Sequence, residues 1–446
     1  MGLRSAKRSR CALTNFMGRI DRGAGSTYLD SQSRLTSNTA NQQRNSVLDV
    51  YNELGVRTII NAKGPATRLS GGPMAAEVVA AMAEASQACV DIAVLQARAS
   101  EIIASHTGAE AGLVTSGAAA GLMLGTAACV TGLDIAKMAR LPNLMGMKNE
   151  VVMVRSQRNL YDHAVRAAGV NIVEVGLPDR YAGAGVRDAE TWEIEAAIGG
   201  KTAAVFYVAD PAARPTLDAV VKTAHGLGVP VLVDAAAQLP PVTNLRRFVD
   251  EGADLVAFSG GKALGGPQGS GMLAGRHELI MSAALQMLDF DIDWEQWTPP
   301  AGLIEKGILK GVPQHGIGRP CKIGKETVVG FLVALRLFAE DDPEKRYARW
   351  LGRIEKIAMG LADLNTLELT IRGDNTADPV PRLLLSVQPE ARLDAQALVT
   401  ELQNGTPSVN VDPTQVDRGI VTIDPTCLQD HEVNTVAARV RALLSV

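Results

Sequence analysis

One stretch of the chain, residues 230–274, restricts the possible folds more than any other. It contains two short apolar runs, Val231–Val233 and Leu255–Phe258, separated by a segment of helical length. Apolar runs this short, bounded by Gly and Pro, are typical of neighbouring buried strands in an α/β sheet. Each run ends in polar residues that a core strand does not need, Asp234 after the first and Ser259-Gly-Gly-Lys262 after the second. Ligands of such sheets bind beyond the carboxyl ends of the strands, so we expect these polar residues to face one crevice.

An aspartate and a lysine at the ends of adjacent strands suggest pyridoxal 5′-phosphate (PLP). Lys262 would form a Schiff base with the PLP aldehyde, and Asp234 would keep the pyridinium nitrogen protonated so that the ring withdraws electrons. Ser259 could reach the cofactor phosphate, and the glycines around the lysine let the backbone approach the ring. Each signal alone has an ordinary explanation, a solvated loop lysine or a helix-capping aspartate. Their combination favours a PLP site.

The segment SGGKALGGPQGSG (259–271), with DAAAQLPP (234–241) upstream, resembles one family of PLP-dependent fold-type I enzymes. That family contains selenocysteine synthase (L-seryl-tRNA(Sec) selenium transferase) and D-glucosaminate-6-phosphate ammonia lyase. The resemblance extends from about Val47 to the C-terminus and implies that Lys262 is the Schiff-base residue. The selenium transferases usually carry an acidic residue just before this lysine, whereas this chain has Gly261, which favours the lyase-like relatives.

The whole sequence predicts a large α/β domain followed by a smaller α+β domain. Strands and helices alternate along the large domain, which implies right-handed crossovers and a mainly parallel, seven-stranded sheet. We expect its last strand, Gly271–Ala274, to run antiparallel, because the connection after Lys262 is too short for a crossover helix. We expect four parts: a disordered basic leader (residues 1–46), an N-terminal interface segment (47–75), a large PLP-binding domain (76–310) and a small C-terminal domain (326–446).

Two further structural expectations concern the second half of the chain. We expect Ile280–Leu288 to form an amphipathic helix, followed by a solvated acidic run. In the small domain we expect a single sheet with helices on one face, formed by four strands at residues 367–372, 382–387, 409–411 and 420–423.

Composition and charge exclude several classes of protein. The 446 residues carry a net charge of only −4, so the total shows no nucleic-acid footprint. Residues 1–46 are an exception, with eight basic residues against two acidic ones; they resemble a flexible tail, with an organelle transit peptide as the alternative. The five cysteines are dispersed, which fits free thiols in the cytoplasm. There is no apolar run of membrane-spanning length, and no zinc motif.

Several residues outside the central stretch are also candidates for the cofactor site. A short apolar run ends in Ser116-Gly117-Ala118 and opens an apolar helix, where free N–H groups and the helix dipole favour an anion. Fold-type I enzymes hold the PLP phosphate at this place. His163 could stack on the pyridine ring or assist proton transfer, with a surface histidine as the alternative. Gln238, four residues after Asp234, could contact the 3′-oxygen of the ring.

Four arginines are candidates for binding substrate. Arg68, in PATRLSGG, matches the arginine of the family's Thr-Asn-Leu-Gly-Arg loop, and Arg319, in a loop dense in Gly, Pro and cations, matches an arginine that helps the selenium transferases bind an anion. Fold-type I enzymes often hold the substrate carboxylate with an arginine of the small domain. Arg382 and Arg372 both fit that role, since a bidentate fork suits a planar anion.

These observations favour a PLP-dependent lyase that converts a hydroxylated amino acid or amino sugar acid to a 2-oxo acid and ammonia. The alternatives are a selenium transferase acting on seryl-tRNA, a racemase, an aldolase, and a non-catalytic relative, against which the retention of Asp234 and Lys262 argues. We expect a small-molecule substrate, a homodimer or larger homo-oligomer with shared active sites, and no tRNA, because the chain lacks the folded tRNA-binding N-terminal domain of the transferases and its body is acidic.

Overall fold

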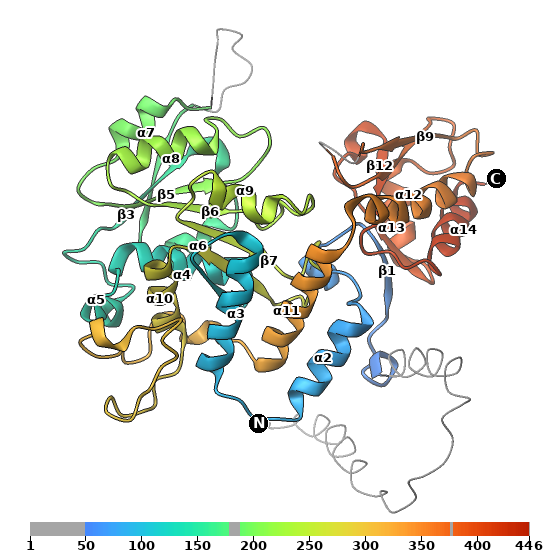
Figure 1. The fold of residues 1–446 in the computed structure, drawn as a ribbon. Coiled ribbons are helices and arrows are strands. Elements are labelled where there is room, and N and C mark those ends of the chain that lie inside the picture. The colour runs from blue at the N-terminus through green and yellow to red at the C-terminus, as the bar shows by residue number, and fades with distance from the viewer. Residues whose placement is uncertain (1–49, 178–187, 375–377, 446) are drawn as a thin grey trace, which may run out of the picture. The chain divides into compact units, whose positions relative to one another are not determined.

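The computed structural model describes three parts of the chain, residues 50–177, 188–374 and 378–445 (Figure 1). The chain forms two compact units, which divide between Thr58 and Ile59. Only residues 50–58 of the first unit are described, and the predicted basic leader lies outside the described residues. The elements below all belong to the second unit.

A seven-stranded sheet forms the centre of this unit, in the spatial order β2-β8-β7-β6-β5-β3-β4. Strands β3 to β7 run parallel to one another, and β8 is antiparallel to both β2 and β7. The predicted seven-stranded, mainly parallel sheet is therefore confirmed, and so is its antiparallel last strand. The strands are β2 (Ala111–Thr115), β3 (Glu150–Val154), β4 (Asn171–Val175), β5 (Thr202–Val208), β6 (Val231–Asp234), β7 (Leu255–Ser259) and β8 (Gly271–Gly275).

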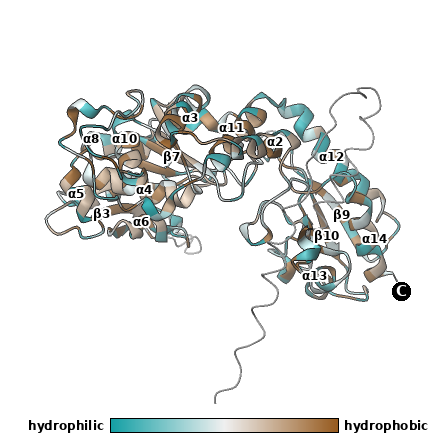
Figure 2. Ribbon diagram, turned by 90° about the horizontal axis from the view of Figure 1, so that it is seen from below, coloured by the Kyte–Doolittle hydropathy of each residue, from teal (hydrophilic) through white to brown (hydrophobic). Residues whose placement is uncertain are grey.

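Helices cover both faces of the sheet, and each face has its own hydrophobic core. Within β7, Leu255 and Ala257 face one core while Val256 and Phe258 face the other, as the two-residue period of a strand requires. Figure 2 shows this strand in the brown of apolar residues. The first core receives side chains from α4 (Ala118–Thr131), α5 (Ile135–Arg140), α6 (Asp162–Ala167) and α10 (His277–Met287). The second receives them from α3 (Ile92–Thr107), α7 (Thr191–Ala197), α8 (Leu217–Gly226), α9 (Asn244–Asp250) and α11 (Lys325–Glu340).

Helix α10 is buried on all sides, whereas its sequence predicts an amphipathic helix. Every residue from Leu279 to Met287 is buried, including the polar Ser282 and Gln286. The acidic run after the helix is solvated as expected, since Asp289, Asp291, Asp293 and Glu295 are exposed, while the neighbouring aromatic residues Phe290 and Trp297 pack into the same core. The helix is therefore covered on the side where its polar residues predicted water, and Ser282 instead donates a 2.5 Å hydrogen bond to the carbonyl oxygen of Gly132.

The C-terminal part forms two small sheets, where the sequence predicts one. Strands β9 (Leu367–Arg372), β10 (Arg382–Val387) and β12 (Ile420–Ile423) form an antiparallel sheet, but β11 (Ser408–Val411) pairs in parallel with β1 (Ile59–Ala62). The prediction that all four strands share a sheet is wrong, because the partner of β11 lies about 350 residues earlier in the chain. The associated helices are α12 (Pro343–Met359), α13 (Ala395–Asn404) and α14 (Val433–Leu444).

The other described elements are short. Helix α2 (Ala76–Ser86) packs against α11. Single turns of 3-10 helix form η1 (Thr67–Leu69), η2 (Arg155–Gln157), η3 (Lys306–Ile308), η4 (Arg319–Cys321) and η5 (Val416–Arg418). Among the described residues, no helix is both long enough and apolar enough to cross a lipid bilayer.

Close packing between α3 and β2 makes a direct test of this fold possible. A β-carbon on Gly112 would lie 2.3 Å from Cγ2 of Ile103, so Gly112→Ala should lower the free energy of unfolding by about 1–3 kcal/mol. Gly199→Ala is the matched control, because Gly199 is exposed and a β-carbon there meets no atom within 4 Å. Urea unfolding measures both variants. Equal midpoints for the two would contradict the packing of α3 on β2.

Candidate active site

Asp234 is the last residue of β6, and it is only 8% exposed. Its carboxylate accepts a 3.0 Å hydrogen bond from the backbone N–H of Ala236. The adjacent strand β7 ends at the half-buried Ser259 and leads into the loop that carries Lys262. Burial raises the pKa of Asp234, and the Ala236 hydrogen bond and attraction to Lys262 only oppose that rise in part. The fold thus brings the acid and the amine close enough to attract each other.

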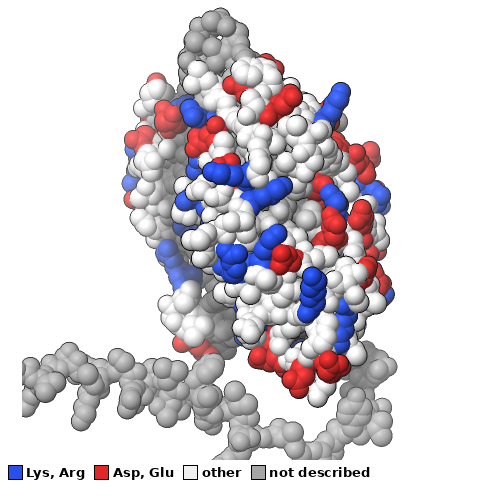
Figure 3. All heavy atoms as spheres, turned by 90° about the vertical axis from the view of Figure 1, so that its left-hand side faces the viewer, with Lys and Arg blue, Asp and Glu red and all other residues white. Residues whose placement is uncertain are grey.

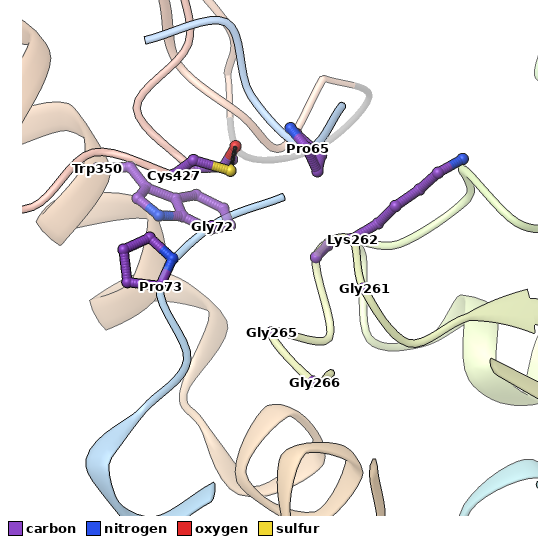
Figure 4. Close-up of a pocket in the computed structure, with 11 residues that line it drawn as sticks. Pro65, Gly72, Pro73, Gly261, Lys262, Gly265, Gly266, Trp350 and Cys427 are labelled. Carbon is purple, nitrogen blue, oxygen red and sulfur yellow. Dashed lines mark hydrogen bonds between the residues drawn. The ribbon is translucent and has the colours of Figure 1, made fainter. Parts of the chain in front are cut away.

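The positive charge of the Lys262 amine is also only partly stabilised by its surroundings. Burial lowers its pKa, and the attraction of Asp234 acts in the opposite direction. A lysine in this setting is neutral, and hence nucleophilic, at lower pH than a solvated one. The backbone of the lysine loop lines a small pocket together with Trp350 and Cys427, but Figure 4 shows that the Lys262 side chain points away from those two residues. The Lys262 amine therefore does not face Trp350 or Cys427.

Glycines before Lys262 allow the loop to fold tightly back on itself. The Gly260 N–H donates a 2.8 Å hydrogen bond to the Ser270 carbonyl, and the Gly266 N–H donates a 2.9 Å bond to the Gly260 carbonyl. A β-carbon on Gly260 would lie 2.2 Å from the Ser270 hydroxyl, and one on Gly261 would lie 2.6 Å from Cα of Gln268. Side chains at these two positions would displace the loop and the lysine with it.

The start of α4 has the features of an anion site that the sequence predicts. Gly117 is the N-cap, with φ of 91°, and no side chain caps the helix there. A β-carbon on Gly117 would meet nothing within 4 Å, so the space in front of the helix is open. The Ser116 hydroxyl is engaged, since it donates a 3.0 Å hydrogen bond to the Cys321 carbonyl. The free N–H groups that begin at Ala118 remain available to an anion.

Gln238 and His163 occupy different settings. The Gln238 side-chain amide donates a 2.7 Å hydrogen bond to the carbonyl of Ala209, just beyond β5, which fixes it at the carboxyl edge of the sheet. His163 lies in the first turn of α6 with an exposed side chain, while its neighbour Asp162 is buried and paired with Arg158. The structure thus holds Gln238 by a protein partner and leaves His163 open to solvent.

Arg68 and Arg319 differ in how much of the guanidinium is free. Arg68 is exposed on η1. Arg319 donates a 2.9 Å hydrogen bond to the Met287 carbonyl at the C-terminus of α10, and a 2.8 Å bond to Asp289. A cation at this end of a helix interacts favourably with its exposed carbonyls. Arg319 therefore caps α10, whereas Arg68 is available to a ligand.

The arginines of the C-terminal sheet are also unequal. Arg382 forms ion pairs with Asp424, at 2.9 Å, and with Asp378, at 3.1 Å. Arg372 lies opposite it on β9 and is exposed. An arginine already balanced by two carboxylates would have to exchange a partner before it could bind a substrate carboxylate.

Comparison with known proteins gives the family. A family model described as L-seryl-tRNA selenium transferase matches residues 75–290. D-Glucosaminate-6-phosphate ammonia lyase of Salmonella typhimurium is 31% identical over 404 residues, which cover 89% of this chain and 98% of that enzyme. A 5′-C-glycyluridine monooxygenase-decarboxylase from Streptomyces is also 31% identical, over 88% of this chain and 92% of that enzyme.

A solved structure agrees with these sequence matches. The structure of a D-glucosaminate-6-phosphate ammonia-lyase superposes with a TM-score of 0.72 at 31% identity, over 88% of this chain and 97% of that chain. The chain belongs to the fold-type I PLP family of selenocysteine synthase and this ammonia lyase. Ureidoglycine-glyoxylate aminotransferase from Bacillus subtilis, at 15% identity and a TM-score of 0.51, shares the fold alone.

For a member of this PLP family, one buried residue that the sequence reasoning missed is notable. Gln157 ends η2, just beyond β3, and is 9% exposed. Its side-chain oxygen accepts a 2.9 Å hydrogen bond from the Val208 N–H, and its side-chain nitrogen is buried without a hydrogen-bond partner among the described residues. Such a donor costs free energy unless a ligand satisfies it. Its position at the carboxyl end of a strand of the sheet, where Asp234 also lies, is the signal that could have revealed it.

The charge imbalance at Asp234 predicts a pH-dependent effect on stability. In the cofactor-free protein, Asp234→Asn should raise the free energy of unfolding at pH 7 and leave it unchanged near pH 3. Burial raises the folded pKa of Asp234, so ionisation destabilises the fold above that pKa, and the cost vanishes below the unfolded value of about 3.9. Asparagine removes the charge but keeps an oxygen for the Ala236 N–H. Chemical denaturation at both pH values measures the difference, and a less stable variant at pH 7 would contradict it.

Proposed function

We propose that the protein is a PLP-dependent ammonia lyase or dehydratase that acts on a hydroxylated amino acid or amino sugar acid. Its products would be a 2-oxo acid and ammonia. The observation that carries the proposal is the 31% identity to D-glucosaminate-6-phosphate ammonia lyase along nearly the whole of both chains. Asp234 and Lys262, at the ends of adjacent strands, supply the two groups that such chemistry needs.

The residues fit PLP on three observations of this structure. The open, uncapped start of α4 would hold the phosphate through the N–H groups that begin at Ala118. The buried carboxylate of Asp234 would accept a hydrogen bond from the ring nitrogen, which would relieve its raised pKa. Lys262 would hold the aldehyde, and the unpartnered amide nitrogen of Gln157 is a further donor at the same sheet edge. When bound, PLP supplies an electron sink that stabilises negative charge at the substrate Cα.

The chain's own residues would carry the proton transfers. The Lys262 amine, whose pKa burial lowers, would take the proton from Cα as a general base. Arg68, exposed beside the lysine loop, would bind an anionic group of the substrate. Loss of the β-hydroxyl releases one water, and hydrolysis of the resulting unsaturated amine consumes one, so the net products are a 2-oxo acid and ammonium.

Decarboxylation is the second candidate, because the monooxygenase-decarboxylase relative matches at the same identity and over nearly the same length. Which bond to Cα breaks depends on which one is held perpendicular to the ring, so racemisation and aldol cleavage are further alternatives on the same site. A selenium transferase on seryl-tRNA is less well supported. The transferase from Serratia proteamaculans is 27% identical over 61% of its length, and the face drawn in Figure 3 mixes basic and acidic side chains where a polyanion would favour basic ones.

A second copy of the chain is the proposed partner, with active sites shared between subunits in a cytoplasmic homodimer or larger oligomer. Support comes from apolar side chains that α2, α3 and the turn between them expose, namely Val79, Val90 and Val94. Sedimentation should therefore give at least a dimer, and Val90→Asp with Val94→Asp should shift it towards monomer, since charges are depleted from the cores of interfaces. A wild-type monomer would contradict this proposal.

Lys262 gives the decisive test of the cofactor assignment. Borohydride reduction of the PLP-loaded protein should yield a pyridoxyl adduct that peptide mapping places on Lys262. Lys262→Arg should abolish the adduct and lower turnover of D-glucosaminate 6-phosphate by at least about 10²-fold, because the general base is lost. An adduct on another lysine would contradict the assignment.

The reaction type needs a separate measurement. Wild-type protein is given D-glucosaminate 6-phosphate and other hydroxylated amino acids, and 2-oxo acid, ammonia, carbon dioxide and oxygen consumption are measured together. Release of 2-oxo acid and ammonia in equal amounts, without oxygen uptake, is the expected result. Carbon dioxide release with oxygen uptake would instead favour the decarboxylase.

A further inference from the structure

The loop of residues 61–72, which carries Arg68, is held from inside by one buried side chain. Asn61, at 6% exposure, donates hydrogen bonds of 3.0 Å to the Gly64 carbonyl and 2.7 Å to the Gly71 carbonyl. Its side-chain oxygen accepts a 3.1 Å bond from the Lys63 N–H. These bonds close the two ends of the loop on each other, but none of them reaches the turn where Arg68 lies.

A second amide, Gln268, reaches that turn from the lysine loop. Its side-chain nitrogen donates a 3.2 Å hydrogen bond to the Thr67 hydroxyl, one residue before Arg68. Its side-chain oxygen is buried against Gly71, where an added β-carbon would lie 2.2 Å from that oxygen. Gly71 has φ of 72°, so both its conformation and its surroundings favour glycine. Gln268 is therefore enclosed by the loop and bonded to its turn.

The other side of Gln268 packs on the residue that precedes the reactive lysine. A β-carbon on Gly261 would lie 2.6 Å from Cα and from the backbone oxygen of Gln268, and 2.8 Å from its side-chain oxygen. The absence of a side chain at position 261 is what makes room for Gln268. One residue thus contacts both the lysine loop and the loop of the exposed arginine.

We propose that Gln268 is a positioning residue that ties the Arg68 turn to the Lys262 loop and so sets where a substrate anion binds relative to the reactive amine. The inference rests on the proposed function in one respect, the assignment of Arg68 to a substrate anion. Gln268 itself acts through Thr67 and Gly71 and need not touch the substrate.

Thr67 allows a test that leaves the core intact, because its side chain is exposed. Thr67→Val removes the hydroxyl that accepts the hydrogen bond and keeps the shape, whereas Thr67→Ser keeps the hydroxyl and serves as the matched control. In the PLP-loaded protein, hydrogen–deuterium exchange of the peptide that spans residues 64–72 should be faster in Thr67→Val than in wild type and unchanged in Thr67→Ser. Gln268→Leu should have the same effect as Thr67→Val.

The link to anion binding is tested with D-gluconate 6-phosphate, which carries a carboxylate and a phosphate but no amine to react. Titration calorimetry should show about three- to tenfold weaker binding in Thr67→Val, the size of one exposed hydrogen bond. In an Arg68→Ala background, which binds more weakly itself, Thr67→Val should have no further effect, because the two changes act through the same group.

Each possible outcome of these experiments either supports or overturns the role proposed for Gln268. Unchanged hydrogen–deuterium exchange in Thr67→Val overturns the proposal. So does faster exchange without any change in the affinity for D-gluconate 6-phosphate. A loss of affinity that is as large in the Arg68→Ala background as in the wild-type background also overturns it. Absence of a pyridoxyl adduct on Lys262, or of lyase activity, would overturn the proposed function instead, while faster exchange with Arg68-dependent loss of affinity would still support the role of Gln268.

Discussion

The site that we propose for PLP is centred on an acid and an amine, Asp234 and Lys262, whose burial outweighs the interactions that stabilise their charges. Asp234 and Lys262 attract each other, yet burial still raises the pKa of the acid and lowers that of the amine. A direct, fully satisfied ion pair would hold both groups charged and unreactive. In the proposed site, this imbalance would make the amine nucleophilic at lower pH and would let the carboxylate accept a hydrogen bond from a charged ring, at the cost of stability.

Close packing at glycine residues fixes the loop that carries Lys262. Around the lysine loop, Gly261 packs on Gln268, Gly71 on the side-chain oxygen of the same Gln268, and Gly72 on Cys427, with distances to an added β-carbon of 2.6, 2.2 and 3.0 Å. These approaches join three regions that are distant in sequence, namely the lysine loop, the N-terminal loop and the residues after β12. Because packed interiors deform little, a change in any of these regions is transmitted to the position of Lys262.

The candidate arginines show that one residue type serves different purposes in one fold. Arg319 satisfies the C-terminus of α10, Arg382 is balanced by Asp424 and Asp378, and Arg68 is exposed. If an arginine that already bonds buried carbonyls or carboxylates moved away, those groups would lose their partner. A buried polar group without a partner costs more free energy than the lost hydrogen bond itself. The exposed Arg68 and Arg372 are therefore freer to bind an anion than Arg319 and Arg382, a distinction that sequence position alone does not make.

The sequence by itself determined the seven-stranded α/β sheet, the antiparallel last strand and the placement of Asp234 and Lys262 on neighbouring strand ends, because these follow from short-range hydrophobic periodicity and loop length. Only the tertiary structure decided that β11 pairs with β1, that α10 is buried all round, and that Gln157 and Gln268 contact Val208 and Thr67. Strand pairing, coverage of a helix face and hydrogen bonding of an amide depend here on residues about 50 to 350 positions away, and local patterns carry no information about such partners.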